Sequence, residues 1–182
     1  MSLFLGSSQC FGTTWQEAYY PEDLPRDWRL DYYANDYSVV LLPSGNWLQE
    51  GLQNLEWPEG LQLIVEVGLE DMRSEYWSEI QSSLQNQPMI RAVAVSDAAA
   101  QQTLEAVGIK AKFWDTLSDD KKLIQLSEEL NVIHLKTPEA VDLRWIRQQL
   151  EQLDPGSETW LFLDAGPAVL AQVKIMVDLM GI

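Results

Sequence analysis

Four polar residues stand within or directly after apolar, strand-like segments of the sequence. Glu66 belongs to LQLIVEV, His134 and Lys136 belong to NVIHLK, and Asp164 follows TWLFL. A charge inside a strand must be paired or face a cavity, and α/β proteins gather their sites at the carboxyl ends of parallel strands. We therefore take Glu66, His134 and Asp164 as candidates for proton transfer, and Lys136 as the cation that would hold an anionic group.

Each of these candidates also has a purely structural interpretation. Lys136 can form an ion pair with Glu66 or Asp164, and His134, the single histidine, can be a hydrogen-bonded strand residue. Asp97 directly precedes an alanine-rich segment and fits a helix N-cap, although it also follows a strand, where ligands bind. Ser8 is a further ligand candidate because it follows the first strand.

The composition excludes several classes of function. A net charge of −16 with 12 basic residues argues against a nucleic-acid partner. One cysteine and one histidine make a metal site implausible, and no glycine-rich loop predicts a nucleotide cofactor. The segment MSLFLGSSQC does not resemble a signal peptide, and no run reaches the ~20 apolar residues of a membrane span. We expect a cytoplasmic protein with no membrane partner, no metal and no cofactor.

Short apolar runs alternate with longer helix-like segments, which predicts an α/β fold with a mainly parallel sheet. The predicted strands are Leu3–Gly6, Ser38–Leu42, Leu61–Val67, Ile90–Val95, Ile109–Phe113, Val132–Lys136 and Thr159–Leu163. Periodicity fits a flavodoxin-like open sheet and a small or incomplete (β/α) barrel equally well.

Capping residues and apolar spacing predict the helices between these strands. One is expected from Ser118, with Leu123, Leu126 and Leu130 on one face, and another from Thr137 and Pro138. A further helix is expected to carry a stripe of Met72, Tyr76, Ile80 and Leu84, and the last to run from about Pro167 to Met180.

The N-terminal part of the sequence is rich in aromatic residues. LFLGSS is followed by Trp15, by YYPEDLP and by WRLDYYA, which leads into the second strand. This order resembles the N-terminal signature of the YecE-like family, TIM-barrel proteins whose biochemical role is poorly defined. LIVEVG, VAVSD, NVIHLKT and WLFLDAGPAV resemble its later strands. The positions that match in order and spacing are Gly6, Ser7, Ser8, Trp15, Tyr20, Pro21, Leu24, Pro25, Leu30, Tyr33 and Ala34.

The resemblance implies that the aromatic segment packs across the end of a barrel where the first helix begins. Large rings with little rotamer entropy also suit packing on general grounds, and ligand stacking by Trp15 and Tyr20 is the alternative. The chain departs from the family at Val40 and Leu42, where polar residues are expected. Only about twenty residues separate Leu42 from the Glu66 strand. We therefore expect one domain over residues 1–182: a reduced or incomplete TIM-like barrel of about six or seven mainly parallel strands.

Two functions follow from this pattern. The first is a non-catalytic protein with a degenerate barrel site that acts through binding or self-association, with a homo-oligomer as its expected form. The second is a binding protein or enzyme for a small anionic metabolite, with a remodelled site built from Glu66, His134, Lys136 and Asp164. A flavodoxin-like module remains a third reading, because SSQCFGTT is polar and contains glycine.

Overall fold

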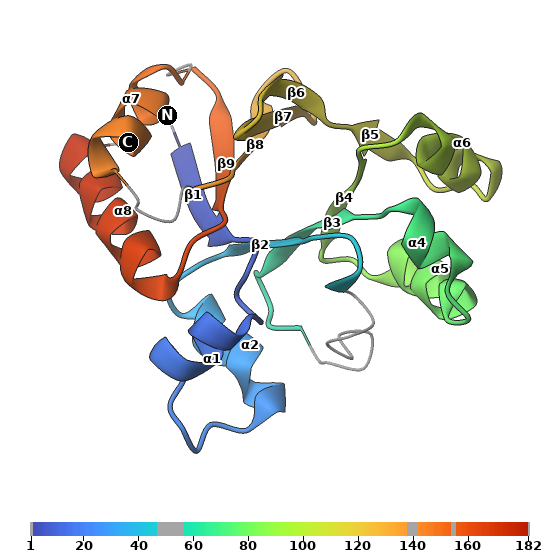
Figure 1. Cartoon of the computed structure of the whole chain (residues 1–182), viewed down its shortest axis with the longest axis horizontal. Helices are drawn as coiled ribbons and strands as arrows, with labels where there is room; N and C mark the ends of the chain where they lie inside the picture. The colour runs from blue at the N-terminus through green and yellow to red at the C-terminus, as the bar shows by residue number, and fades with distance from the viewer. Residues whose placement is uncertain (1, 47–56, 138–141, 154–155, 182) are drawn as a thin grey trace.

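The computed structural model describes residues 2–46, 57–137, 142–153 and 156–181. Within these residues a nine-stranded mixed sheet curls into a nearly closed ring, with helices packed outside it (Figure 1). The strand order is β5-β4-β3-β2-β1-β9-β8-β7-β6. The strands are β1 (Ser2–Ser7), β2 (Val39–Leu42), β3 (Gln62–Glu66), β4 (Ile90–Val95), β5 (Ala111–Phe113), β6 (Asp115–Ser118), β7 (Lys121–Gln125), β8 (Leu130–Leu135) and β9 (Glu158–Leu163).

Seven α-helices occur among the described residues, together with one short 3-10 turn, η1 (Arg26–Trp28). In Figure 1, α1 and α2 lie below the ring, α4, α5 and α6 lie on its right, and α7 and α8 lie on its left. The helices are α1 (Thr13–Ala18), α2 (Arg29–Ala34), α4 (Leu69–Arg73), α5 (Trp77–Asn86), α6 (Ala98–Ala106), α7 (Leu143–Glu151) and α8 (Pro167–Met180). The expected Met72–Leu84 helix is thus divided between α4 and α5.

The expected TIM-like barrel of six or seven mainly parallel strands is wrong. The sheet has nine strands and is mixed, because β7 runs antiparallel to both β6 and β8. The β6–β7 hairpin occupies the place where leucine spacing predicted a helix from Ser118. Its residues alternate instead with the period of a strand: Leu123 packs toward the helix-side core and Ile124 toward the ring interior. Neighbouring strands therefore override local helical spacing here.

A single chain segment joins the two ends of the sheet. β5 pairs with β4, and β6 pairs with β7. A single residue, Trp114, separates β5 from β6 along the chain. The Trp114 backbone N–H still donates to the Val95 carbonyl at 2.9 Å. Residues 111–118 thus run as one extended segment that pairs first with one edge of the sheet and then with the other. β5 and β6 are therefore the end strands of the sheet, and they pair with the edges that β4 and β7 would otherwise expose.

The strands bury two distinct apolar layers. The outer layer combines strand residues with helix residues such as Leu104, Ile146 and Leu170. The inner layer lies inside the ring and contains only residues from the strands and Trp114. Its buried members are Val39, Leu41, Ile64, Ala94, Trp114, Ile124, Leu130, Val132, Trp160 and Phe162. Gly6 also faces this interior, where a Cβ would collide with the Val39 carbonyl oxygen and the Phe162 ring.

The prediction that the aromatic segment packs against the fold is confirmed for its central rings. Trp15, Tyr20 and Tyr33 are buried, and Trp15 Nε1 donates to the Ala165 carbonyl at 2.9 Å. The Tyr33 hydroxyl accepts from the Ser7 N–H at 2.9 Å and donates to the Val39 carbonyl at 3.1 Å, so it bridges β1 and β2. Trp28, in contrast, is 61% exposed.

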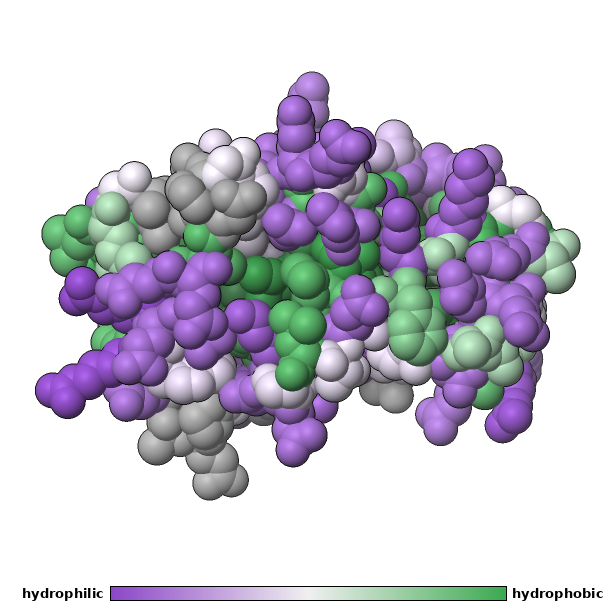
Figure 2. All heavy atoms as spheres, turned by 90° about the horizontal axis from the view of Figure 1, so that it is seen from above, coloured by the Kyte–Doolittle hydropathy of each residue, from purple (hydrophilic) through white to green (hydrophobic). Residues whose placement is uncertain are grey.

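The side of the ring formed by β6 and β7 has no described helix outside it (Figure 1). On the segment that joins the sheet edges, Phe113 is 42% and Leu117 is 56% exposed. Figure 2 shows the molecule from above the view of Figure 1, with apolar side chains gathered near the middle of a largely polar face.

Among the described residues, no helix has both the length and the apolar character that crossing a membrane requires.

Truncating Trp114 tests whether its ring fills the interior where the sheet closes. We expect Trp114→Ala to lower the free energy of unfolding by about 3–5 kcal/mol, because it removes a fully buried indole from a packed core. Urea denaturation followed by far-UV circular dichroism measures this loss. Trp28→Ala is the matched control, expected to change stability by less than about 0.5 kcal/mol. Equal effects of the two substitutions would contradict this role of Trp114.

Candidate functional site

Polar side chains from both halves of the sheet meet at the carboxyl ends of the parallel strands. One set is centred on Asp164, which follows β9. Its Oδ1 lies 2.7 Å from His134 Nε2 on β8, and it also accepts a hydrogen bond from Ser8 Oγ, which follows β1. Three candidates from the sequence, Ser8, His134 and Asp164, thus lie together on or directly after three neighbouring strands. His134 and Asp164 form a close pair that Ser8 extends.

The pKa of Asp164 reflects opposing effects. Partial burial by itself raises the pKa of this carboxyl group. The hydrogen bond and electrostatic attraction of His134, the hydrogen bond from Ser8 and the charge of Lys136 outweigh burial, so the pKa of Asp164 lies below its ordinary value. Asp164 is therefore an ionised acceptor at neutral pH, held by partners that favour its charged form.

Two ring nitrogens beside this pair lack a hydrogen-bond partner among the described residues. They are His134 Nδ1 and Trp114 Nε1, and both atoms are buried. The two ring centroids are 6.0 Å apart, and the ring planes are inclined at 47°. Buried polar groups are nearly always hydrogen-bonded, and leaving one unpaired costs about 1–3 kcal/mol. The two nitrogens are therefore the feature of this end of the barrel that most needs a physical explanation.

A second polar set spans the ring. Lys122 Nζ on β7 lies 3.4 Å from Glu66 Oε1 on β3 and 3.2 Å from Ser96 Oγ, which follows β4. Ser96 Oγ in turn donates to Glu66 Oε1 at 2.8 Å. Because β3 and β7 are not neighbours in the sheet, this ion pair connects opposite parts of the barrel wall.

The two sets are adjacent. Lys122 lies directly opposite His134 in the β7–β8 register, and its Nζ is 6.0 Å from the centroid of the Trp114 ring. Directly opposed residues of an antiparallel pair have Cβ atoms about 5 Å apart. We call the combined arrangement the mouth; it consists of Ser8, Glu66, Ser96, Trp114, Lys122, His134 and Asp164.

Three members of the mouth were not predicted from the sequence. Lys122 was assigned to a helix that does not form, which hid its place on a strand facing the interior. Trp114 and Ser96 were not among the candidate residues. The segment KKLIQ also fits the alternation of a β-strand, with Lys122 and Ile124 on one face. This pattern would have indicated that Lys122 lies on a strand.

The remaining predicted site residues lie in different surroundings. Lys136 is exposed at the rim above His134 and lines a hollow of about 520 Å³ with Asp120, Thr137, Asp142 and Trp145. It pairs with neither Glu66 nor Asp164, although its charge acts on Asp164. Ser8 lines a second hollow of about 330 Å³.

Asp97 is the N-cap of α6, as one reading of the sequence proposed. Its Oδ1 accepts from the Ala99 N–H at 2.7 Å and from the Ala100 N–H at 3.2 Å. The predicted cap at Thr137 and Pro138 is wrong, because α7 begins at Leu143 and its N-cap is Asp142. Pro138 lies outside the described residues, and Thr137 Oγ1 instead donates to the Asp164 carbonyl.

Val40 and Leu42 do not line the interior. Both belong to the outer layer that packs against the helices, whereas Val39 and Leu41 of the same strand face inward. Their apolar character is what a helix-facing position requires. It therefore provides no sign that an interior site was lost.

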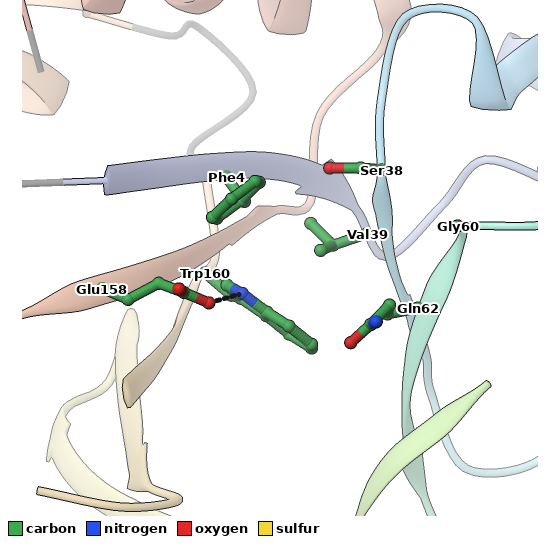
Figure 3. A pocket seen from close by; sticks show the side chains of 7 residues that line it. All are labelled: Phe4, Ser38, Val39, Gly60, Gln62, Glu158 and Trp160. Carbon is green, nitrogen blue, oxygen red and sulfur yellow. Dashed lines mark hydrogen bonds between the residues drawn. The ribbon is translucent and has the colours of Figure 1, made fainter. Parts of the chain in front are cut away.

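The opposite end of the barrel is different in character. A hollow of about 150 Å³ lies at the amino ends of the strands. The side chains that line it are drawn in Figure 3: Phe4, Ser38, Val39, Gly60, Gln62, Glu158 and Trp160. Trp160 Nε1 donates to Glu158 Oε1 at 2.9 Å, so this indole nitrogen is paired. The contrast with Trp114 makes the mouth, rather than this end, the candidate site.

Among the described residues, no cluster of three histidine, cysteine or acidic side chains could hold a metal ion. Comparison of the chain with protein-family models, curated proteins and solved structures gives no significant match. Membership of the YecE-like family therefore stays a prediction from the sequence motifs.

Replacing Asp164 tests its role as an ionised partner. Because its pKa is lower in the folded than in the unfolded state, its stabilisation is present above the unfolded value of about 3.9 and is lost as the pH falls through the folded value. We expect Asp164→Asn to reduce the free energy of unfolding at neutral pH by about 1–3 kcal/mol. The difference from wild type should shrink below about pH 4.

Urea denaturation between about pH 7 and pH 2 measures both curves. Asp23→Asn, which replaces an exposed aspartate, is the control and should follow wild type throughout. A difference between Asp164→Asn and wild type that stays constant with pH would show that Asp164 does not act through its charge.

Proposed function

We propose that this protein binds a small anionic molecule at the mouth of its barrel. The observation that carries the proposal is a pair of buried nitrogens, on His134 and Trp114, that have no hydrogen-bond partner among the described residues. Unsatisfied buried polar groups are costly, and convergent polar groups are what small-molecule sites use to fix a ligand. The proposal assigns binding and no reaction.

The charges at the mouth support an anionic ligand. The chain has a net charge of −16 and only 12 basic residues, yet Lys122 and Lys136 both lie at this end of the barrel. Lys122 is engaged by Glu66. The exposed Lys136 ammonium has no hydrogen bond or ion pair in the described part of the chain, so it is available to an incoming anion. Such local cations can offset the repulsion that an acidic protein exerts on anions.

The alternative of a degenerate barrel acting through self-association loses the arguments that favoured it. Val40 and Leu42 face the helices and give no sign of a lost interior site, and the segment at residues 111–118 pairs with the edges of β4 and β7. One observation still favours self-association: Phe113 and Leu117 are exposed beside the helix-free β6–β7 side.

We include a cytoplasmic location in the proposal, because the composition of the chain suggests it.

A thermal-shift screen against phosphates, sugars and carboxylates tests the proposal. A ligand at about 100 times its dissociation constant should add about 2.7 kcal/mol of stability to the wild type. We expect Lys136→Ala to weaken this stabilisation. Lys110→Ala, which removes an exposed lysine beside the amino end of β5, is the control and should leave it unchanged.

Three outcomes would count against binding at the mouth. No shift in the wild type with any compound would leave self-association as the better function, which sedimentation at high concentration would then measure. Equal responses of Lys136→Ala and wild type to a hit would place the ligand elsewhere. A loss of response in Lys110→Ala as large as in Lys136→Ala would indicate a nonspecific charge effect.

A further inference from the structure

Asp164 determines which nitrogen of the neutral His134 ring carries the proton. An ionised carboxylate can only accept hydrogen bonds, and Asp164 Oδ1 lies 2.7 Å from His134 Nε2. Nε2 must therefore be the donor, which leaves Nδ1 of the neutral ring with a lone pair and no proton. A carboxylate that fixes the tautomer and orientation of a histidine is the usual way to present the other nitrogen as an acceptor.

The two unpartnered nitrogens are complementary. Trp114 Nε1 is a donor only, and His134 Nδ1 in this tautomer is an acceptor only. A carboxylate or phosphate oxygen without a proton could satisfy Trp114 but not His134, and an ammonium group could satisfy His134 but not Trp114. A hydroxyl group satisfies both, because its oxygen accepts while its proton is donated.

We infer that the mouth recognises a hydroxyl group on its ligand, held between Trp114 Nε1 and His134 Nδ1, with Asp164 as the residue that positions His134. This inference rests on the proposed function and names its ligand class: small acids that carry a hydroxyl group. The hydroxyl provides the specificity, and the exposed Lys136 at the rim attracts the acidic group. That group can be a carboxylate or a phosphate, since both are anions that a lysine holds.

The recognition should be sharp. A site that hydrogen-bonds a ligand hydroxyl rejects the analogue without it, because the buried polar groups of the site are then left unpaired. We expect the hydroxylated member of a matched pair to bind at least about tenfold more tightly than its deoxy counterpart. The pairs are L-malate with succinate and L-lactate with propionate, which differ by one hydroxyl group, and glycerol 3-phosphate with propyl phosphate, which differ by two.

The first measurement requires no ligand. His134 is the only histidine in the chain, so long-range proton–nitrogen NMR of ¹⁵N-labelled protein reports a single imidazole. At about pH 8.5, where a histidine is ordinarily neutral, we expect Nε2 to be protonated and Nδ1 to be unprotonated. Asp164→Asn should weaken or reverse this preference. A protonated Nδ1 in the wild type, as the other tautomer or as a persistent imidazolium, would overturn the inference.

The second measurement is isothermal titration of the three ligand pairs. Trp114→Phe removes the indole N–H while keeping an aromatic ring, and should cost the hydroxylated ligand about tenfold in affinity while leaving the deoxy ligand unchanged. Trp160→Phe is the matched control, since this interior tryptophan already donates to Glu158 at the other end of the barrel. It should leave the affinities of both members of each pair unchanged.

The outcomes separate this inference from the proposed function. Equal binding of both members of each pair would show that the two nitrogens are satisfied by bound water alone; the inference would then fail while anion binding stands. A preference confined to malate and lactate, or to glycerol 3-phosphate, identifies the acidic group. Binding by none of the six compounds would overturn the ligand class, even if the screen finds another anion.

Discussion

The arrangement of this protein depends on one extended segment, residues 111–118, that pairs with β4 along its first half and with β7 along its second. Without this segment the sheet would have two open edges and an exposed interior. Trp114 lies where the pairing changes sides, and its backbone remains bonded to Val95 while its indole fills the inner layer. Closure also brings Lys122 within reach of Glu66 across the ring. The polar mouth is therefore a consequence of the way in which the sheet closes.

The mouth combines features that stabilise the fold with features that do not. Glu66 and Lys122 compensate each other, and Asp164 is held by His134 and Ser8, so each carboxylate has partners that favour its charge. Trp114 Nε1 and His134 Nδ1 have no such compensation among the described residues. A stable fold gains nothing from unpaired buried nitrogens, and functional sites are where such local costs are retained. The other interior tryptophan, Trp160, has its nitrogen paired with Glu158, which shows that the barrel interior can supply an acceptor for an indole N–H.

Much of the architecture could be predicted from local sequence pattern. Apolar runs located all seven strands that were expected, because a strand buried on both faces requires an apolar run wherever it lies. The same runs indicated that Glu66, His134 and Asp164 need partners or a cavity. The prediction failed for β6 and β7, where Leu123, Leu126 and Leu130 happen to follow helical spacing in a segment that the neighbouring strands hold extended. It also failed for Val40 and Leu42, because the sequence does not show which face of a doubly buried strand turns toward the helices.

The sequence by itself determined the position of seven strands and the burial of the central rings of the aromatic N-terminal segment. It also determined the shortage of basic residues that makes each lysine at the mouth informative. These properties follow from residue type and short-range spacing, which are fixed before the chain folds. Only the tertiary structure decided that the sheet is mixed and nearly closed, that Glu66 pairs with Lys122 instead of Lys136, and that Trp114 and His134 lie side by side with unmatched nitrogens. Those outcomes depend on register and on contacts between strands that are distant in sequence. Shifting a strand by one residue would turn every one of its side chains to the other face.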